Sequence, residues 1–252
     1  MPSGFVWYEL MTPDAKAAES FYSSAVGWKA TDSGVPGMSY TLLLAGGTPR
    51  AGLMALPKEA CDAGAKPGWV GYIGVDDVDS CVARVAKAGG ATHVPPTDIP
   101  QVGRFAMLAD PQGAVFCLFK PNTDMTPAAD EMQPGSIGWH ELMAADGEKA
   151  FAFYSGLFGW SRAEAIDLGP MGRYQLFTAG GDPIGGMMTK PPEIPEPFWS
   201  YYFRVDSIGA ALERLKAAGA RVINGPMEVP GGSWIVQAVD PQGAAFSLVG
   251  AK

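Results

Sequence analysis

The chain has 252 residues, of which 47% are hydrophobic and 17% are charged, so it can bury a core and is not a disordered protein. Its formal net charge of −8 argues against a nucleic-acid-binding surface, which needs clustered Lys and Arg, and against attraction to an anionic membrane. No uncharged apolar run approaches the ~20 residues of a membrane span.

Cysteine usage and the first residues bear on the compartment. Cys61, Cys81 and Cys117 are an odd number at no metal-like spacing, which favours reduced thiols. The opening "MPSGFVWYEL" lacks the basic and apolar regions of a secretory signal. We therefore expect a cytoplasmic protein.

The sequence contains a long internal repeat. "WYELMTPDAKAAESFYSSAVGW" (7–28) matches "WHELMAADGEKAFAFYSGLFGW" (139–160) without a gap, and "DPQGAVFCL" (110–118) matches "DPQGAAFSL" (240–248). A period near 130 residues is too long for a solenoid and indicates a duplicated domain. The predicted domains are 1–121 and 136–252, joined by a linker at 122–135 that is poor in apolar residues.

Each copy predicts the same elements in the same order. A strand (5–11 or 137–143) is followed by a helix with an Asp cap, Asp14 or Asp146, and a terminal glycine, Gly27 or Gly159. Short strands follow, with "AGGTPRAG" and "AGGDPIGG" as hairpin turns rather than phosphate-binding loops. A second helix starts at Asp77 or Ser207 and ends at Gly89 or Gly219, and a tight DPQG turn precedes the last apolar strand. This order predicts an α+β fold with a mainly antiparallel sheet and helices on one face.

These motifs resemble the vicinal oxygen chelate superfamily of glyoxalase I, extradiol dioxygenases and bleomycin-resistance proteins. The resemblance rests on D-x₆-FY-x₄-GW after a first strand, "VDDVDSCVARVAKAGG" and the DPQG strand. It implies two tandem glyoxalase-like domains, each of two βαβββ units whose curled, antiparallel-rich sheet surrounds a cavity. The fold serves isomerases, dioxygenases, lyases and simple binders, so the function must be argued from the site.

The resemblance also implies where metal ligands would stand. The corresponding positions hold Trp7, Val70 and Cys117 in the first copy, Trp139, Ser200 and Ser247 in the second, and the segments 52–54 and 186–188. These residues are not the imidazole and carboxylate donors that Zn, Ni, Mn or Fe prefer. We therefore predict no cofactor, with a divalent metal held by His140 and Glu141 as the alternative.

His140 stands one residue beyond the ligand position of its strand. Successive strand side chains point to opposite faces, so His140 should pack under the helix, as Tyr8 does in the other copy, unless a bulge re-aims it. The other histidine, His93, falls in a loop-like "ATHVPP" stretch and is expected to be a surface or packing residue.

Two glutamates, Glu9 and Glu141, are expected to face the cavity. A carboxylate among aromatic rings can act as a general acid or base, whereas the structural alternative pairs it with Arg104 or Arg204. The ligand-binding candidates are Trp7, Tyr40, Met54, Tyr72 and Phe105 in the first copy and Trp139, Tyr174, Met188, Tyr202 and Trp234 in the second.

The functional prediction is a protein that binds a small apolar or aromatic molecule in a cavity that has lost the usual metal ligands. The alternative is a superfamily enzyme, a lyase, isomerase or dioxygenase-like catalyst, that uses Glu141, Glu9 or a divalent metal near His140. In the second case the copy with the histidine is the better candidate for chemistry. The expected partners are a small molecule and, at most, a second copy in a homodimer, with no nucleic acid and no membrane.

Overall fold

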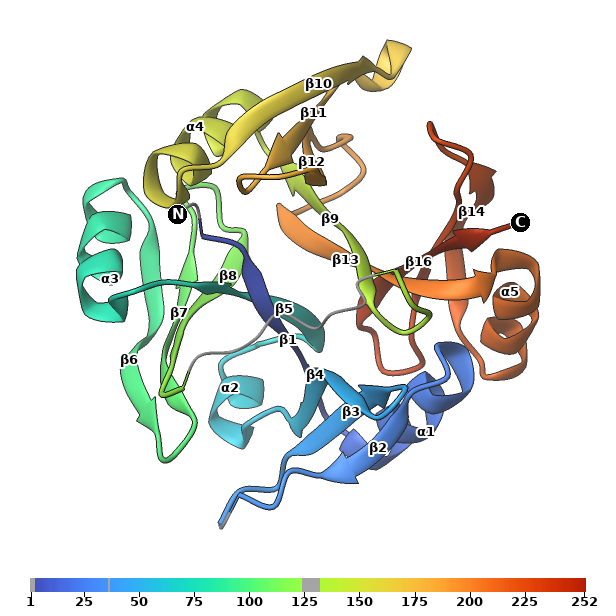
Figure 1. Ribbon diagram of the computed structural model, residues 1–252, viewed down its shortest axis with the longest axis horizontal. Coiled ribbons are helices and arrows are strands. Elements are labelled where there is room, and N and C mark those ends of the chain that lie inside the picture. The colour runs from blue at the N-terminus through green and yellow to red at the C-terminus, as the bar shows by residue number, and fades with distance from the viewer. Residues whose placement is uncertain (1–2, 36, 124–131) are drawn as a thin grey trace. The chain divides into compact units, whose positions relative to one another are not determined.

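A βαβββ module occurs four times in the computed structural model, which describes residues 3–35, 37–123 and 132–252 (Figure 1). The first module is β1 (Phe5–Thr12), α1 (Ala15–Ala25), β2 (Lys29–Asp32), β3 (Thr41–Ala45) and β4 (Thr48–Ala55). After the short helix α2 (Lys58–Asp62), the second is β5 (Gly68–Gly74), α3 (Val78–Lys87), β6 (Ala91–Ile99), β7 (Gly103–Ala109) and β8 (Val115–Pro121).

The second sequence copy repeats the pattern. Its modules are β9 (Ile137–Ala144), α4 (Gly147–Phe158), β10 (Ser161–Asp167), β11 (Arg173–Thr178) and β12 (Pro183–Thr189), then β13 (Phe198–Ser207), α5 (Ile208–Ala217), β14 (Arg221–Glu228), β15 (Trp234–Val239) and β16 (Ala245–Ala251). A 3₁₀ turn (Gly169–Met171) separates β10 from β11. Each sequence copy thus contains two modules, as the α+β prediction requires.

Strand pairing is the same in every module. The first strand pairs in parallel with the last, as β1 does with β4 and β13 with β16, and the other pairs are antiparallel. The orders β2-β3-β4-β1 and β5-β8-β7-β6 belong to one eight-stranded sheet, and β10-β11-β12-β9 and β13-β16-β15-β14 belong to the other. The mainly antiparallel α+β fold is confirmed.

The described residues form two compact units that do not follow the sequence repeat. The first takes the described parts of Met1–Val6, Val70–Pro127 and His140–Ser200, and the second takes those of Trp7–Trp69, Ala128–Trp139 and Tyr201–Lys252. Each unit therefore combines one module from each sequence copy. The domain limits 1–121 and 136–252 stay predictions, and residues 124–131 of the predicted linker lie outside the described residues.

The predicted helix ends are confirmed. Side chains of Asp14, Asp77 and Asp146 accept hydrogen bonds from the backbone N–H three residues on, and Ser207 does the same for α5. Gly27, Gly159, Gly89 and Gly219 all have positive φ after the helices, a conformation that glycine adopts without steric cost.

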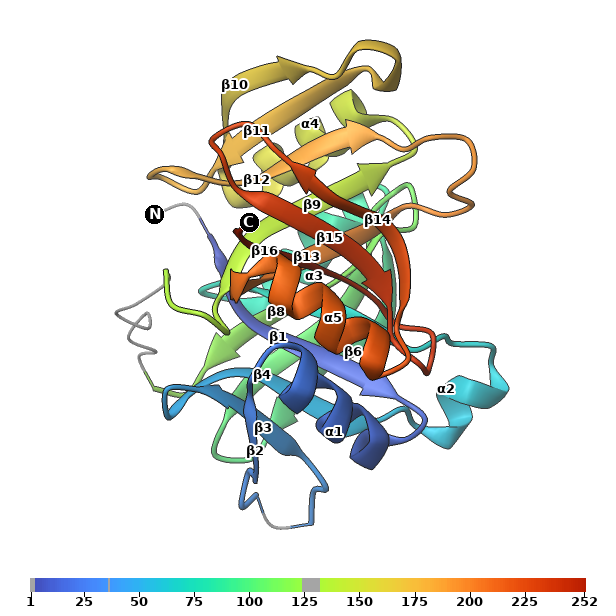
Figure 2. The same ribbon diagram turned by 90° about the vertical axis from the view of Figure 1, so that its right-hand side faces the viewer.

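Helices cover one face of the strands within each unit. In the first unit α3 lies along β6, β7 and β8 (Figure 1). In the second α5 lies along β14, β15 and β16 and also packs on α1 (Figure 2). No helix in the described ranges has the length and apolar character needed to cross a membrane.

A buried aromatic and acidic cluster fastens α1 in the second unit. The Tyr22 hydroxyl accepts a hydrogen bond from Trp69 Nε1 (2.9 Å) and donates one to Asp240 Oδ2 (3.0 Å). Asp240 Oδ1 accepts from the backbone N–H of Gln242 and Ala244 inside the DPQG turn. Burial raises the pKa of Tyr22 well above its usual range, so the phenol stays a donor.

The first unit contains the same cluster with the copies exchanged. Tyr154 on α4 accepts from Trp199 (2.9 Å) and donates to Asp110 (3.2 Å), whose other oxygen accepts from Gln112 and Ala114. The DPQG turn of each sequence copy therefore contacts the first helix of the other copy, in keeping with compact units that each draw on both copies.

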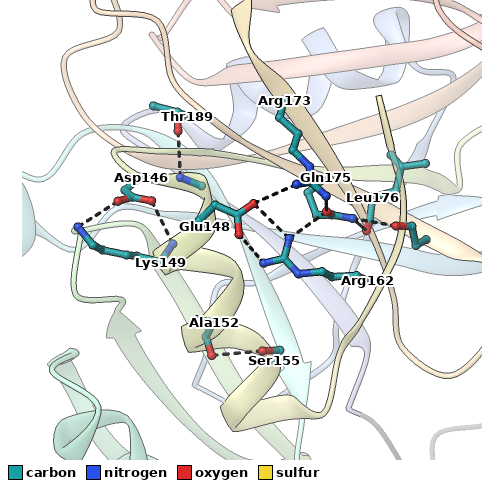
Figure 3. A network of polar contacts seen from close by, with 12 residues as sticks. Asp146, Glu148, Lys149, Ala152, Ser155, Arg162, Arg173, Gln175, Leu176 and Thr189 are labelled. Atoms are coloured by element: carbon teal, nitrogen blue, oxygen red, sulfur yellow. Dashed lines mark hydrogen bonds and ion pairs between the residues drawn. The ribbon is translucent and has the colours of Figure 1, made fainter. Parts of the chain in front are cut away.

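A polar network in which exposed ion pairs meet the buried Gln175 accompanies α4 of the second copy (Figure 3). Arg162 binds Glu148 (2.5 Å) and Gln175 (2.9 Å), and Arg173 shares the Gln175 oxygen (2.9 Å). The first copy has Lys16 and Ala30 at the positions of Glu148 and Arg162. Because these ion pairs face water, they add little to stability.

His93 lies in β6, so the expectation of a loop there is wrong, although its exposure fits a surface residue. β6 is an edge strand, and prolines such as Pro95 and Pro96 are tolerated at sheet edges because the missing N–H is not needed there.

Candidate functional site

The two faces of β1 have different chemistry in the second unit. Leu10 and Thr12 are fully buried on the face that packs against the core, where Tyr8 also meets the Tyr201 ring at 5.4 Å. Trp7, Glu9 and Met11 occupy the other face by alternation. This second face, with the residues of β4 that lie beside it, is called the Glu9 face.

A hydrogen bond joins two of the predicted ligand-binding residues on the Glu9 face. Trp7 Nε1 donates to the Tyr40 hydroxyl at 2.9 Å. In the parallel register Glu9 lies beside Gly52 and Met11 beside Met54. The structure therefore brings Trp7, Glu9, Tyr40 and Met54 together on one face of the β1–β4 pair.

Gly52 explains how the tyrosine ring reaches this position. A Cβ at Gly52 would stand 1.8 Å from the Tyr40 hydroxyl and 2.3 Å from its Cζ, so only glycine leaves room for the ring. The phenol thus covers the backbone directly beside Glu9, a residue that is only 6% exposed.

The same arrangement occurs on β9 and β12 of the first unit. Glu141, 7% exposed, lies beside Gly186, and a Cβ there would stand 2.2 Å from the Tyr174 ring. Met143 lies beside Met188. This face of β9 and β12, called the Glu141 face, therefore groups Glu141, Tyr174 and Met188 as predicted. The fourth predicted residue, Trp139, belongs to the second unit.

His140 lies on the opposite face from Glu141. Its ring stacks on Phe5, with centroids 4.3 Å apart and planes 7° apart, and Phe5 packs edge-on against Trp199 of the buried Tyr154 cluster. His140 Nδ1 donates to the Ile184 carbonyl at 2.6 Å. Burial lowers the pKa of His140 to about 4, the Ile184 carbonyl opposing this, so the ring is neutral at pH 7. Strand alternation predicted this packing position.

The residues at the positions where the resemblance would place metal ligands do not fit a divalent metal. They offer indoles, an alkyl group, one thiol and two hydroxyls in place of imidazole and carboxylate. Among residues 3–35, 37–123 and 132–252, no group of three His, Cys, Asp or Glu side chains is placed to hold an ion. His140 and Glu141, the alternative pair, point to different faces of β9, because adjacent residues of a strand alternate.

Tyr72 and Phe105 meet in the first unit, as the prediction grouped them. Tyr72 lies beside Cys117 in the β5–β8 register, and its ring is 6.4 Å from Phe105 and 6.2 Å from Phe119. Arg104, which precedes Phe105 in β7, points to the opposite, helix-covered face and binds Asp79 of α3 at 2.7 Å. Arg104 is therefore engaged with α3 and with Asp98.

Trp234 is a correction to the predicted set. The register places it level with Gly250 and on the same face of β15 and β16 as the core residue Phe246, with the Lys252 ammonium 4.7 Å from its ring. Tyr202 lies beside Ser247, which points to the other face. The prediction placed Trp234 with Phe105, but the 130-residue offset pairs Phe105 with Ile235 and Arg104 with Trp234.

A row of polar side chains beside Tyr202 was missed. Gln237 and Asn224 stand level with Ser247 across β16, β15 and β14, and Gln237 Nε2 donates to the Tyr202 hydroxyl at 2.8 Å. Aligning the copies singles out Gln237, because the first copy has Met107 at that position, but it does not show which residues lie beside Gln237.

Comparison with known proteins identifies relatives across almost the whole chain. The model of the Glyoxalase/Bleomycin resistance protein/Dioxygenase superfamily matches residues 4–118 and 136–248. The Mycobacterium tuberculosis protein named "Putative glyoxylase CFP32" is 34% identical over 96% of this chain and 93% of its own length. The anthracycline biosynthesis protein DnrV of Streptomyces peucetius is 31% identical over 98% of this chain and 93% of its own.

A solved structure supports the fold. The Mn(II)-bound glyoxalase from Novosphingobium aromaticivorans superposes with a TM-score of 0.67 at 16% identity, covering 99% of this chain and 82% of that one. At this identity the similarity concerns the fold alone.

Proposed function

Because the chain belongs to the Glyoxalase/Bleomycin resistance protein/Dioxygenase superfamily, we propose that it binds a small planar aromatic or apolar molecule on the Glu9 and Glu141 faces. The observation that carries the proposal is the Trp7–Tyr40 hydrogen bond, which fixes two large rings on the face where metal-dependent relatives are expected to hold their ligands. Trp and Tyr bind planar molecules through extended apolar contact while the polar tip stays satisfied.

The relatives support the aromatic class of ligand. DnrV is named for anthracycline biosynthesis, and an anthracycline is a planar polycyclic aromatic compound. The side chains on the two faces, two methionines on each face together with tyrosines and a tryptophan, suit such a surface, because methionine adapts its shape to different rings.

Titration calorimetry with fluorene, a planar hydrocarbon, tests this proposal. We expect saturable binding that Trp7→Leu weakens about tenfold, since the indole supplies contact area and positions Tyr40. Trp234→Leu is the matched control. It removes an indole from β15 on the face that carries the core residue Phe246, away from the proposed binding faces, and should leave the affinity within about twofold. Absence of fluorene binding, or equal loss in both variants, would refute the proposal.

A second candidate function is catalysis by Glu141 or Glu9. Each carboxylate is buried to more than nine-tenths and stands beside a backbone position covered by a tyrosine ring, which is the environment of a general acid or base. In this proposal the carboxylate moves a proton on the bound molecule, as a lyase or isomerase requires. Consumption of a bound compound by the natural protein and by Glu9→Gln, but not by Glu141→Gln, would assign the reaction to the second copy.

A further inference from the structure

A pocket of about 430 Å³ opens in the first unit between the start of α3 and the end of α4, two helices that lie next to each other (Figure 1). The wall formed by α3 includes Ser80, Cys81 and Arg84, which stand three, four and seven positions after the cap Asp77. This spacing places the four side chains on one face of the helix. The facing wall is the last turn of α4, at 157–159.

Arg84 joins the two walls and has donors that remain unused. Its Nη2 donates to the Leu157 carbonyl at 2.7 Å and to the Gly156 carbonyl at 3.2 Å, so the guanidinium caps the last turn of α4. Its Nε and Nη1 groups make no hydrogen bond with any residue that the structure describes. The guanidinium therefore offers positive charge and N–H groups to a ligand.

Two carboxylates stand at the other end of the α3 wall. Asp76 and Asp77 directly precede the helix, and Asp77 Oδ1 accepts from the Ser80 N–H at 3.0 Å. Within the described ranges, neither carboxylate forms an ion pair. Asp77 and Arg84 are separated by about 10 Å of helix rise. The wall therefore has a negative end and a positive end.

Neutral polar groups lie between these ends. Cys81 is 4% exposed, and its thiol makes no hydrogen bond to the part of the chain that the structure describes. Burial raises the pKa of the Cys81 thiol, with Arg84 opposing this, so the thiol stays protonated at pH 7. The exposed Ser80 hydroxyl likewise has no described partner. A ligand that spans the pocket meets both groups halfway, and such groups gain from a partner.

The second unit keeps the arginine but replaces its neighbours. Arg214 Nη2 donates to the Ala25 carbonyl at 3.2 Å, as Arg84 does to α4. The positions of Asp77, Ser80 and Cys81 hold Ser207, Ala210 and Ala211. The arginine bridge is thus common to both units, whereas the carboxylate, hydroxyl and thiol beside it belong to the first unit.

We propose that this pocket binds a short peptide with free ends. The peptide ammonium lies beside Asp76 and Asp77, its carboxylate lies on Arg84, and its amide lies against Ser80 and Cys81. A dipeptide carries its opposite charges at its two ends and one amide between them, which is the order in which the wall presents its groups. The Glu141 face contributes none of the described lining residues, so this proposal does not depend on the proposed function.

An NMR titration of the whole chain with L-alanyl-L-alanine tests the proposal. We expect the backbone amide signals of Ser80 and Gly159 to shift in a saturable manner. The N-acetyl derivative lacks the ammonium and the C-terminal amide derivative lacks the carboxylate, so each should bind about threefold to tenfold more weakly. 6-Aminohexanoate keeps both charges without the peptide group and should also bind more weakly than the dipeptide.

Variants at the two ends assign the charges. Asp76→Asn should weaken binding of the dipeptide and of its C-terminal amide about threefold to tenfold and leave the N-acetyl derivative within about twofold. Arg84→Gln keeps a donor for α4 and should weaken the dipeptide and its N-acetyl derivative but not the C-terminal amide. Asp206→Asn and Arg214→Gln are the matched controls in the second copy and should change no affinity.

Absence of shifts at Ser80 and Gly159 would overturn the proposal, as would equal losses in the variants and in their second-copy controls. Ser80→Ala installs the residue of the second copy and should weaken the dipeptide but not 6-aminohexanoate. Equal affinities for these two compounds, both unaffected by Ser80→Ala, would overturn the assignment to peptides.

Discussion

Acid should destabilise this protein through a single buried histidine. His140 is stacked on Phe5 and donates to the Ile184 carbonyl, and burial lowers its pKa from 6.5 to about 4. The unfolded chain therefore takes up a proton near pH 6.5, whereas the folded chain resists protonation until about pH 4. The stability that the neutral ring provides is complete above pH 6.5 and is lost as the pH falls towards 4.

The size of this effect follows from the two pKa values. At 1.36 kcal/mol per pH unit, the gap between 6.5 and about 4 corresponds to about 3 kcal/mol, most of which is lost between pH 7 and pH 4.5. A small domain has only about 5–15 kcal/mol of total stability, so the loss is large enough to measure.

Urea unfolding of the natural protein and of His140→Gln over this pH range isolates the contribution. Glutamine keeps a donor for the Ile184 carbonyl but does not titrate, so carboxylates that titrate in both proteins cancel in the difference. We expect the natural protein to lose about 2 kcal/mol more than the variant between pH 7 and pH 4.5. The chain has only two histidines, so a proton–carbon NMR titration can follow the His140 ring directly. Parallel stability curves, or a His140 midpoint near 6.5, would refute the reasoning.

Three further predictions concern packing. Tyr22→Phe should lower the free energy of unfolding by about 2–3 kcal/mol, because it leaves the Asp240 carboxylate and the Trp69 N–H without their shared partner; denaturant unfolding measures this, and a loss below 0.5 kcal/mol would contradict the proposed brace. Gly52→Ala should displace the Tyr40 ring, lower the free energy of unfolding by about 1–3 kcal/mol and change the near-ultraviolet circular dichroism. Gly181→Ala is the control and should have none of these effects, because the space around its Cβ is open. Equal effects of the two substitutions would show that the Tyr40 ring does not need Gly52. Gln242→Ala removes the side chain that accepts a hydrogen bond from the Asp14 N–H (2.7 Å) and donates one to the Asp14 carbonyl (2.8 Å). Amide hydrogen exchange should therefore become faster in the first turn of α1 and stay unchanged in α4. An equal change in both helices would argue against a local role of Gln242.

Much of the fold follows from local sequence signals. Asp14 and Asp146 cap their helices, Gly159 ends one of them with positive φ, and the alternation of β9 places His140 away from Glu141. These features depend on residues within a few positions of each other, so their sequence pattern specifies them.

The face that a strand side chain occupies depends on the exact register. The prediction for Trp234 is wrong because a misalignment of one residue moves a strand side chain to the opposite face. His93 lies in an edge strand, and the two prolines that follow it led to the prediction of a loop. The polar row of Gln237 was visible only after the strands were paired, because its members come from four separate segments.

The sequence by itself determined the duplication, the four modules, the helix ends and the aromatic character of the Glu9 and Glu141 faces. Tertiary structure decided that the turn at Asp240 fastens Tyr22, 218 positions away, while its twin at Asp110 fastens Tyr154. Both turns read DPQG and both helices carry FY, so each turn could satisfy either tyrosine by chemistry alone. The choice between them is made by the packing of whole modules, since a hydrogen bond between distant segments forms only where burial has already brought them together.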